Sequence, residues 1–157
     1  MGPRLIRIAA VAAAAIGIYA LCVVPYRANL MLTVVDRRST LADAASPSRA
    51  AELAHENLRD LDVARYGVRL DPNWYLLYGA NCETLGRWDE AADVYTRALR
   101  IDQRPELYVN RGLVMLHLGR LDAAEADLTR AARFNPNVLN ELGGDLRTRV
   151  AAAAGLR

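Results

Sequence analysis

The chain has 157 residues, of which 53% are hydrophobic and 24% charged, a composition that suits one small domain plus an additional apolar segment. Every basic residue is arginine, and the charge is uneven: residues 1–39 hold five arginines and one acid, or +4, which leaves fifteen arginines and seventeen acids, or −2, for the remainder. A slightly acidic domain lacks the basic patch that nucleic-acid binding needs, so this class of function is excluded.

The first segment of the chain is apolar. No charged residue occurs from Ile8 to Val24, and the apolar run extends from Leu5 to Tyr26 with only Arg7 interrupting it. At about 1.5 Å per residue, this is close to the roughly twenty residues that cross a bilayer core. We therefore predict a single transmembrane anchor at residues 1–26.

Two other interpretations of this segment stay open. A basic start followed by an apolar run also fits a cleaved signal peptide, and a buried helix of a soluble protein is the third possibility. Against cleavage, the run is long and alanine-rich, and the bulky Tyr19 and Leu21 precede Cys22, which makes a poor lipoprotein site. The arginines clustered before the run favour a cytoplasmic amino terminus, so we expect the rest of the chain on the outer side of a bacterial membrane.

Residues 27–46 are predicted to be a juxtamembrane linker. Residues 30–35 are apolar enough to prolong the helix or to lie in the membrane interface, and Asp36-Arg37-Arg38 marks the return to water. Ser46-Pro47 has the composition of a helix start, because serine caps free amides and proline suits the first turn.

One pattern then occurs twice between residues 72 and 138. A shift of thirty-three residues, the separation of Gly79 from Gly112, also places Leu85-Gly86-Arg87 on Leu118-Gly119-Arg120 and Thr96-Arg97-Ala98 on Thr129-Arg130-Ala131. Apolar residues recur at spacings of three and four on both sides of the Gly-Arg turn, which is typical of two antiparallel helices per copy. The fold class is therefore predicted to be all-α.

At these positions the sequence resembles the tetratricopeptide repeat family. The residues that carry the resemblance are the small ones where helices pack closely, the turn glycines and a closing proline: Gly79, Gly86, Ala91 and Ala98 in the first copy, and Gly112, Gly119, Ala124, Ala131 and Pro136 in the second. Gln103 departs from the pattern where proline is usual, and Cys82 and Met115 where an aromatic residue is usual. The resemblance implies a short solenoid of helical hairpins, with repeats at 72–104 and 105–137.

Two repeats are too few to be stable, since such stacks generally need about three units. The segment 47–71 ends like the second helix of a repeat, but no matching first helix is evident before it, so we predict a half-repeat that covers one end. Residues 138–157 are predicted to be a capping helix at the other end, weakened by Gly143-Gly144. Together these segments make a domain of residues 47–157.

The sequence has few residues in arrangements that support catalysis or metal binding. His55 and His117 lie in different predicted helices without cysteine or acid at ligand spacing, and Cys22 and Cys82 lie in different segments. We therefore predict no catalytic residue, no metal site and no cofactor.

The family resemblance implies instead a concave groove, lined by the first helix of each repeat, that holds an extended peptide or a helix of a partner. The residues expected to face it are Asn73, Leu76, Ala80, Glu83, Glu106, Val109, Asn110, Leu113, Leu116 and His117. Some family members grip a terminal carboxylate there, and Asn110-Arg111 resembles one element of that clamp. Leu76 and Ala80, however, stand where lysine and asparagine would be expected.

The sequence thus predicts a non-enzymatic, membrane-tethered adaptor that binds a protein partner. The alternative is a self-assembling structural component of a bacterial envelope complex, with pairing between copies. The second half of the chain also resembles the repeat tails of some envelope glycan ligases, which hints at surface-polysaccharide assembly.

Overall fold

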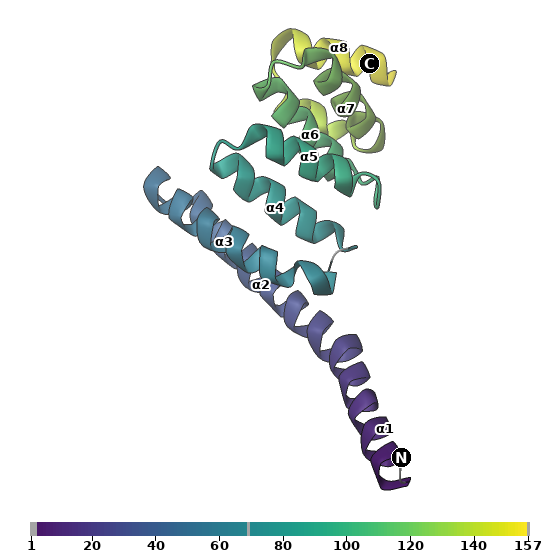
Figure 1. Ribbon diagram of the computed structural model, residues 1–157. Helices are drawn as coiled ribbons and strands as arrows, with labels where there is room; N and C mark the ends of the chain where they lie inside the picture. Colours follow the sequence, from purple (N-terminus) through teal and green to yellow (C-terminus); the bar gives the residue numbers. More distant parts are fainter. Residues whose placement is uncertain (1–2, 69, 157) are drawn as a thin grey trace.

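The computed structural model describes residues 3–68 and 70–156, with side chains from Ile8 onward (Figure 1). Within these residues the chain is helical and has no strand, which confirms the predicted fold class. A long rod at the amino-terminal end leads into a stack of antiparallel helices (Figure 1).

The rod consists of three helical segments without a break: α1 (Pro3–Ile18), the π-helical η1 (Tyr19–Val23) and α2 (Val24–Asp43). The backbone is right-handed helical at the junctions Ile18 and Val23. Pro25 explains the π-helical turn, because its ring has no N–H and crowds the carbonyl four residues earlier. The helix widens there and continues.

Helix α2 pairs with α3 (Pro47–Val68), which runs back alongside it (Figure 1). The buried face of α2 consists of Ala28, Leu32 and Val35, at the spacing of one helical face. The two helices approach closely at Gly67, where an added Cβ would lie 2.6 Å from the Cβ of Ala28. Only glycine allows this approach.

This pairing differs from two expectations. The segment expected to be a linker at 27–46 is mostly helix α2, and α3 is not a half-repeat without a partner, since α2 is its first helix. The physical reason is the buried stripe of α2, which packs on Leu58, Leu61 and Ala64 of α3 in the same core. The stack therefore begins inside the predicted linker.

Two further hairpins follow. Helices α4 (Pro72–Thr84) and α5 (Trp88–Ala98) form the first, and α6 (Pro105–His117) and α7 (Leu121–Phe134) form the second. Each hairpin turns at a glycine with positive φ, 68° at Gly86 and 69° at Gly119, a conformation that side chains disfavour. The four alanines of the repeat pattern are fully buried in the second helices: Ala91, Ala98, Ala124 and Ala131.

The carboxyl-terminal cap is divided. Pro136 begins a 3₁₀ helix, η2 (Pro136–Glu141), and α8 (Gly144–Ala154) follows it. The expected capping helix therefore starts late, because Gly144 has φ +50° and Gly143 is extended. Asn135 caps η2 by accepting a hydrogen bond from the amide of Asn137.

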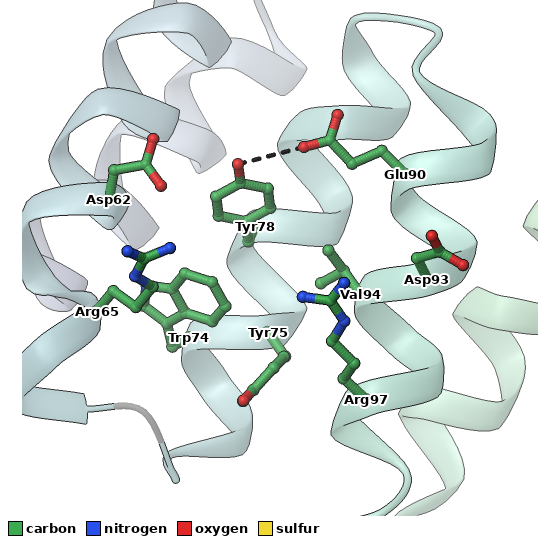
Figure 2. A pocket seen from close by; sticks show the side chains of 9 residues that line it. All are labelled: Asp62, Arg65, Trp74, Tyr75, Tyr78, Glu90, Asp93, Val94 and Arg97. Carbon is green, nitrogen blue, oxygen red and sulfur yellow. Dashed lines mark hydrogen bonds between the residues drawn. The ribbon is translucent and has the colours of Figure 1, made fainter.

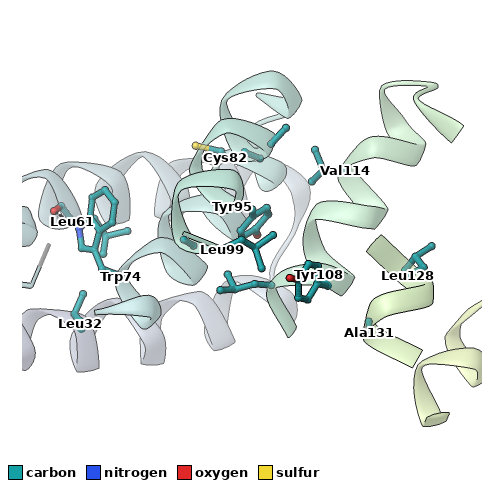
Figure 3. Packing of buried hydrophobic residues seen from close by; sticks show 14 of the residues in the cluster. Leu32, Leu61, Trp74, Cys82, Tyr95, Leu99, Tyr108, Val114, Leu128 and Ala131 are labelled. Atoms are coloured by element: carbon teal, nitrogen blue, oxygen red, sulfur yellow. Dashed lines mark hydrogen bonds between the residues drawn. The ribbon is translucent and has the colours of Figure 1, made fainter. Parts of the chain in front are cut away.

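One hydrophobic core runs through the whole stack (Figure 3). It extends from Leu32 in α2 through Tyr95 in α5 to Val150 in α8. Tyr95 is among the largest fully buried side chains, and its ring lies against the backbone of Gly79. Successive hairpins thus stabilise one another, as in other repeat proteins.

A buried polar network also joins the first three helices of the stack. The Asn57 amide donates to Asn81 Oδ1 at 2.9 Å and to Ser39 Oγ at 3.1 Å. Arg38 donates to Asn57 Oδ1 at 3.2 Å and to Asp60 at 2.9 Å. Because buried polar groups need their partners, this network fixes α2 on α3 and α4 in one register.

Candidate functional site

The first helices of the hairpins lie on one side of the stack, where α2 contacts α4 and α4 contacts α6. Between α2 and α4 there is an open hollow of about 490 Å³. Its walls are Asn29, Leu32, Thr33 and Asp36 from α2, and Asp71, Asn73, Leu76 and Leu77 from the start of α4. We call this hollow the α2–α4 groove.

The groove combines an apolar floor with a polar rim. The leucines of the lining are buried or half-buried and form the floor, whereas the amides and the carboxylate of Asp36 are exposed and, with the half-buried Asp71, form the rim. Asp71 also caps α4 by accepting a hydrogen bond from the amide of Asn73 at 2.9 Å, which fixes this end of the wall. Such a surface suits an apolar side chain on a polypeptide with basic residues beside it.

Two of the predicted groove residues, Asn73 and Leu76, line this hollow. Ala80 is exposed farther along α4. The predicted residues of α6 lie outside the α2–α4 groove: Glu106 and His117 are exposed, whereas Val109, Asn110, Leu113 and Leu116 are half-buried.

Glu83 and Asn110 are engaged within the stack. The Tyr95 hydroxyl donates to Glu83 Oε1 at 2.5 Å, and the Asn110 side chain is a second hydrogen-bond partner of this hydroxyl. Burial raises the pKa of Glu83, while the hydrogen bond from Tyr95 opposes that change. These side chains join α4, α5 and α6, so their first role is structural.

His117 also has a partner within the chain. Its ring stacks on Trp88 with a centroid separation of 4.0 Å and an interplanar angle of 8°. The stack joins the end of α6 to the start of α5.

Arg111, the arginine of the possible carboxylate clamp, already forms hydrogen bonds within the chain. Arg111 donates from Nε and Nη2 to the two carboxylate oxygens of Asp127, each at 2.7 Å, and from Nη1 to Thr96 at 3.1 Å. The hydrogen bond to Asp127, which is almost fully buried, raises the pKa of Arg111. This bidentate pair ties α6 to α7 and α5 and leaves no clamp of the expected kind at Arg111.

The α2 side of the groove is what sequence reasoning missed. Asn29, Thr33 and Asp36 fall in the predicted linker because the segment lacks the repeat pattern. The sequence nevertheless contains a pattern that indicates a packed helix here, since Ala28, Leu32 and Val35 recur at intervals of four and three.

A second hollow lies on the opposite side, between α3 and α5, with α4 as its floor (Figure 2). It has a volume of about 260 Å³ and is lined by the aromatic side chains Trp74, Tyr75 and Tyr78 together with three acids and two arginines. Tyr78 donates to Glu90 Oε1 at 3.3 Å, as Figure 2 shows, and burial raises the pKa of Tyr78 to about 12.

Candidate reactive groups are sparse in the described residues. No three His, Cys, Asp or Glu side chains among them lie close enough to hold a metal ion. Cys82 is fully buried, and burial raises the pKa of its thiol to about 12, so the thiolate needed for nucleophilic chemistry is suppressed at neutral pH.

The amino-terminal rod has the properties of a membrane span by length and composition. The helix beginning at Ile8 contains a window with a mean hydropathy of 2.3, none of which is buried against the rest of the chain. The rest of the described chain therefore does not bury this segment, and a signal sequence passes the same test of length and composition.

Stacked hairpins with glycine turns and buried alanines define a tetratricopeptide-type solenoid. Residues 105–138 match the family model described as tetratricopeptide repeat, which covers the α6–α7 hairpin and its exit. No protein with curated annotation matches the chain.

Solved structures agree on the fold. A thermophilic TPR protein of Thermus thermophilus, TTC0263, is 26% identical with a TM-score of 0.63, and the match covers 80% of this chain and 63% of that one. The chain therefore spans less than two thirds of that neighbour's length. The type III secretion chaperone SycD of Yersinia enterocolitica, solved with a peptide of the translocator YopD, is 20% identical with a TM-score of 0.55, covering 78% and 91% of the two chains. A type III secretion complex from Aeromonas hydrophila is 21% identical with a TM-score of 0.51, covering 78% and 77%.

Proposed function

We propose that the protein is a membrane-tethered adaptor that holds a segment of a partner protein in the α2–α4 groove. The observation that carries this proposal is the groove itself, an open hollow with leucines below and amides and carboxylates at its rim. Extended peptides and helices are recognised by such combinations of an apolar pocket and a polar edge. The SycD structure, in which a solenoid of this fold occurs with a peptide, supports the same use of the fold.

In this proposal the tether and the groove are directly connected. The apolar helix α1 would hold the protein in the membrane, and α2, its direct continuation, is one wall of the groove. A partner bound there is concentrated at the membrane surface, as any linked site concentrates its ligand.

Site-specific photo-crosslinking tests the proposal. Benzoylphenylalanine in place of Leu76, in the full-length protein in its native membranes, should give one discrete adduct with a second protein, identified by mass spectrometry. The matched control carries the same group in place of Asp93, an exposed residue of α5 that lines the hollow on the opposite side.

Three outcomes separate the interpretations. An adduct with a different protein, formed at position 76 and weakened by Leu113→Arg, would support a partner that runs from α4 to α6. An adduct with a second copy of the chain would favour the self-assembling component instead. Equal adducts at positions 76 and 93, or none at position 76, would contradict a docking role for the groove.

A further inference from the structure

Three large apolar or aromatic side chains at the end of α3 and just after it are mostly exposed in the described chain. Val63 is 70% exposed, Tyr66 77% and Leu70 68%. A large apolar side chain left in water does not gain the free energy that burial would give it. Single exposed apolar residues are ordinary, but a cluster of this kind marks an interaction surface.

The position of this cluster along the rod indicates what covers it. At Gly67, α3 touches the backbone of Val24 and the side chain of Ala28, so the end of α3 is level with the start of α2. The apolar run of the rod ends at the same level, at Tyr26, after about 30 Å of helix counted from Ile8. Figure 1 shows this end of α3 beside the point where the rod leaves the stack.

A small hollow adjoins the cluster between the rod and α3. Its volume is about 250 Å³, and its walls are almost entirely apolar, with one charged side chain: Tyr19, Val24, Arg27, Ala28, Met31, Val63, Ala64 and Gly67. Such a hollow at this level would admit part of an acyl chain and place the guanidinium of Arg27 near a phosphate.

Aromatic and cationic groups meet on the outer side of the cluster. The Arg65 guanidinium lies 5.0 Å from the centre of the Tyr66 ring and donates to the Tyr66 hydroxyl at 3.1 Å. Tyr26, on the rod, is 69% exposed. Tyrosine and arginine over an apolar base are the residues that favour the head-group region of a bilayer, where ring and stem lie in the apolar layer and the polar tips meet phosphates.

We infer that this surface, formed by Tyr26, Val63, Tyr66 and Leu70 with Arg27 and Arg65 beside it, docks on the head-group region of the bilayer that the rod enters. The inference rests on the tether of the proposed function and adds a second membrane contact to it. With two contacts, the stack cannot turn freely about the rod, and the α3–α4 corner with the Asp71 end of the α2–α4 groove faces the lipid.

Spin-label depth measurements test this contact. The full-length protein, with Cys22→Ser and the buried Cys82 retained, is reconstituted in nanodiscs of phosphatidylcholine and phosphatidylglycerol. A nitroxide at Val63→Cys should collide more often with oxygen, which partitions into lipid, than with a water-soluble nickel chelate. A nitroxide at Arg49→Cys, at the other end of α3, should show the reverse order.

A third label, at Ile16→Cys, reports the tether separately and should be dominated by oxygen. If the label at position 63 is in water and the label at position 16 is in lipid, the docking surface is contradicted and the tether is retained. Water exposure at both positions overturns the tether as well. Oxygen dominance at position 49 overturns the docking surface too, because the whole of α3 would then lie in lipid. When Tyr66→Glu and Leu70→Glu are added, the nitroxide at position 63 should collide more often with the nickel chelate than with oxygen. If oxygen collisions still dominate, Tyr66 and Leu70 do not form the membrane contact.

Discussion

At Gly79, α4 and α5 approach each other closely. A Cβ at this position would overlap the ring of Tyr95, and one at Gly112 would lie 2.9 Å from Leu128 Cγ in the next hairpin. Since both neighbours are fully buried, neither can move aside without disturbing the core. The two glycines hold equivalent places in the two copies, which explains why the repeat retains glycine inside a helix.

Gly79→Ala is therefore expected to destabilise the protein by about 1–3 kcal/mol through overpacking. Thermal unfolding followed by circular dichroism in detergent checks this. Gly143→Ala is the matched control, because a Cβ there meets nothing within 4 Å and φ is negative. A melting temperature unchanged by Gly79→Ala would mean that the Tyr95 ring can move, contrary to its full burial.

For individual residues, the sequence predicts the close packing of helices better than it predicts the hydrogen bonds between polar side chains. The buried alanines and the turn glycines follow from the repeat pattern. The hydrogen bonds of Glu83 and Asn110 to Tyr95 do not follow from it, and the sequence indicated only that these two residues face the groove. The Asn57–Asn81 hydrogen bond is likewise absent from any local pattern, since its partners are 24 residues apart. Such pairs depend on which helices meet, and a single sequence does not specify this.

Helix α2 is the element whose place in the fold differs most from the expectation of a linker at residues 27–46. Its apolar residues serve two environments: Leu32 and Val35 enter the core of the stack, while Leu30 and Val34 stay exposed. A continuous apolar stretch of this kind does not reveal by itself whether it faces lipid, solvent or protein. The structure resolves this because α3 lies along one face only.

Val35→Asp is expected to release α2 from α3, because the substitution puts an unpaired charge at a position that is fully buried. Released α2 would expose the bonds after Arg37 and Arg38, so limited trypsin digestion should cut there many times faster than in the unchanged protein. Val34→Asp is the control: the neighbouring side chain is 46% exposed, and cleavage should stay slow. Equal cleavage of the two variants would contradict the observed packing of α2.

At the scale of the whole molecule, buried groups with raised pKa values determine how the stability of the fold changes at high pH. Burial raises the pKa of Cys82 from 9.0 to about 12 and that of Tyr78 from 10.0 to about 12, and burial beside Glu83 raises the pKa of Tyr95. Each group stays neutral in the folded chain at a pH at which it ionises in the unfolded chain. Their stabilising contribution is complete below about pH 9 and is lost as the pH rises toward 12.

The melting temperature should therefore fall steeply between about pH 9 and pH 12, with a smaller slope in Tyr78→Phe, which removes one of these groups. Circular dichroism melts at several pH values in this window provide the measurement. A flat profile would mean that these side chains reach water readily. Equal slopes in the two proteins would exclude Tyr78 as a contributor.

The general architecture was predictable because a repeat of thirty-three residues defines its own packing. The two central hairpins lie where the repeated pattern places them, and helical segments flank them on both sides. The ends of the stack were less predictable, since terminal units lack the pattern that identifies the others. There α2 joins the rod to the stack, and Gly143-Gly144 divides the cap into η2 and α8.

In the tethered arrangement proposed above, the unbroken path from α1 through η1 to α2 would link the groove to the thickness of the bilayer. An apolar helix longer than the local hydrocarbon layer tilts to fit it, and a rigid continuation tilts by the same angle. One wall of the α2–α4 groove is that continuation, so a thinner membrane would lower the groove toward the lipid and a thicker one would raise it. Lipid composition would thereby set the height at which a partner is met, without any change in the groove itself.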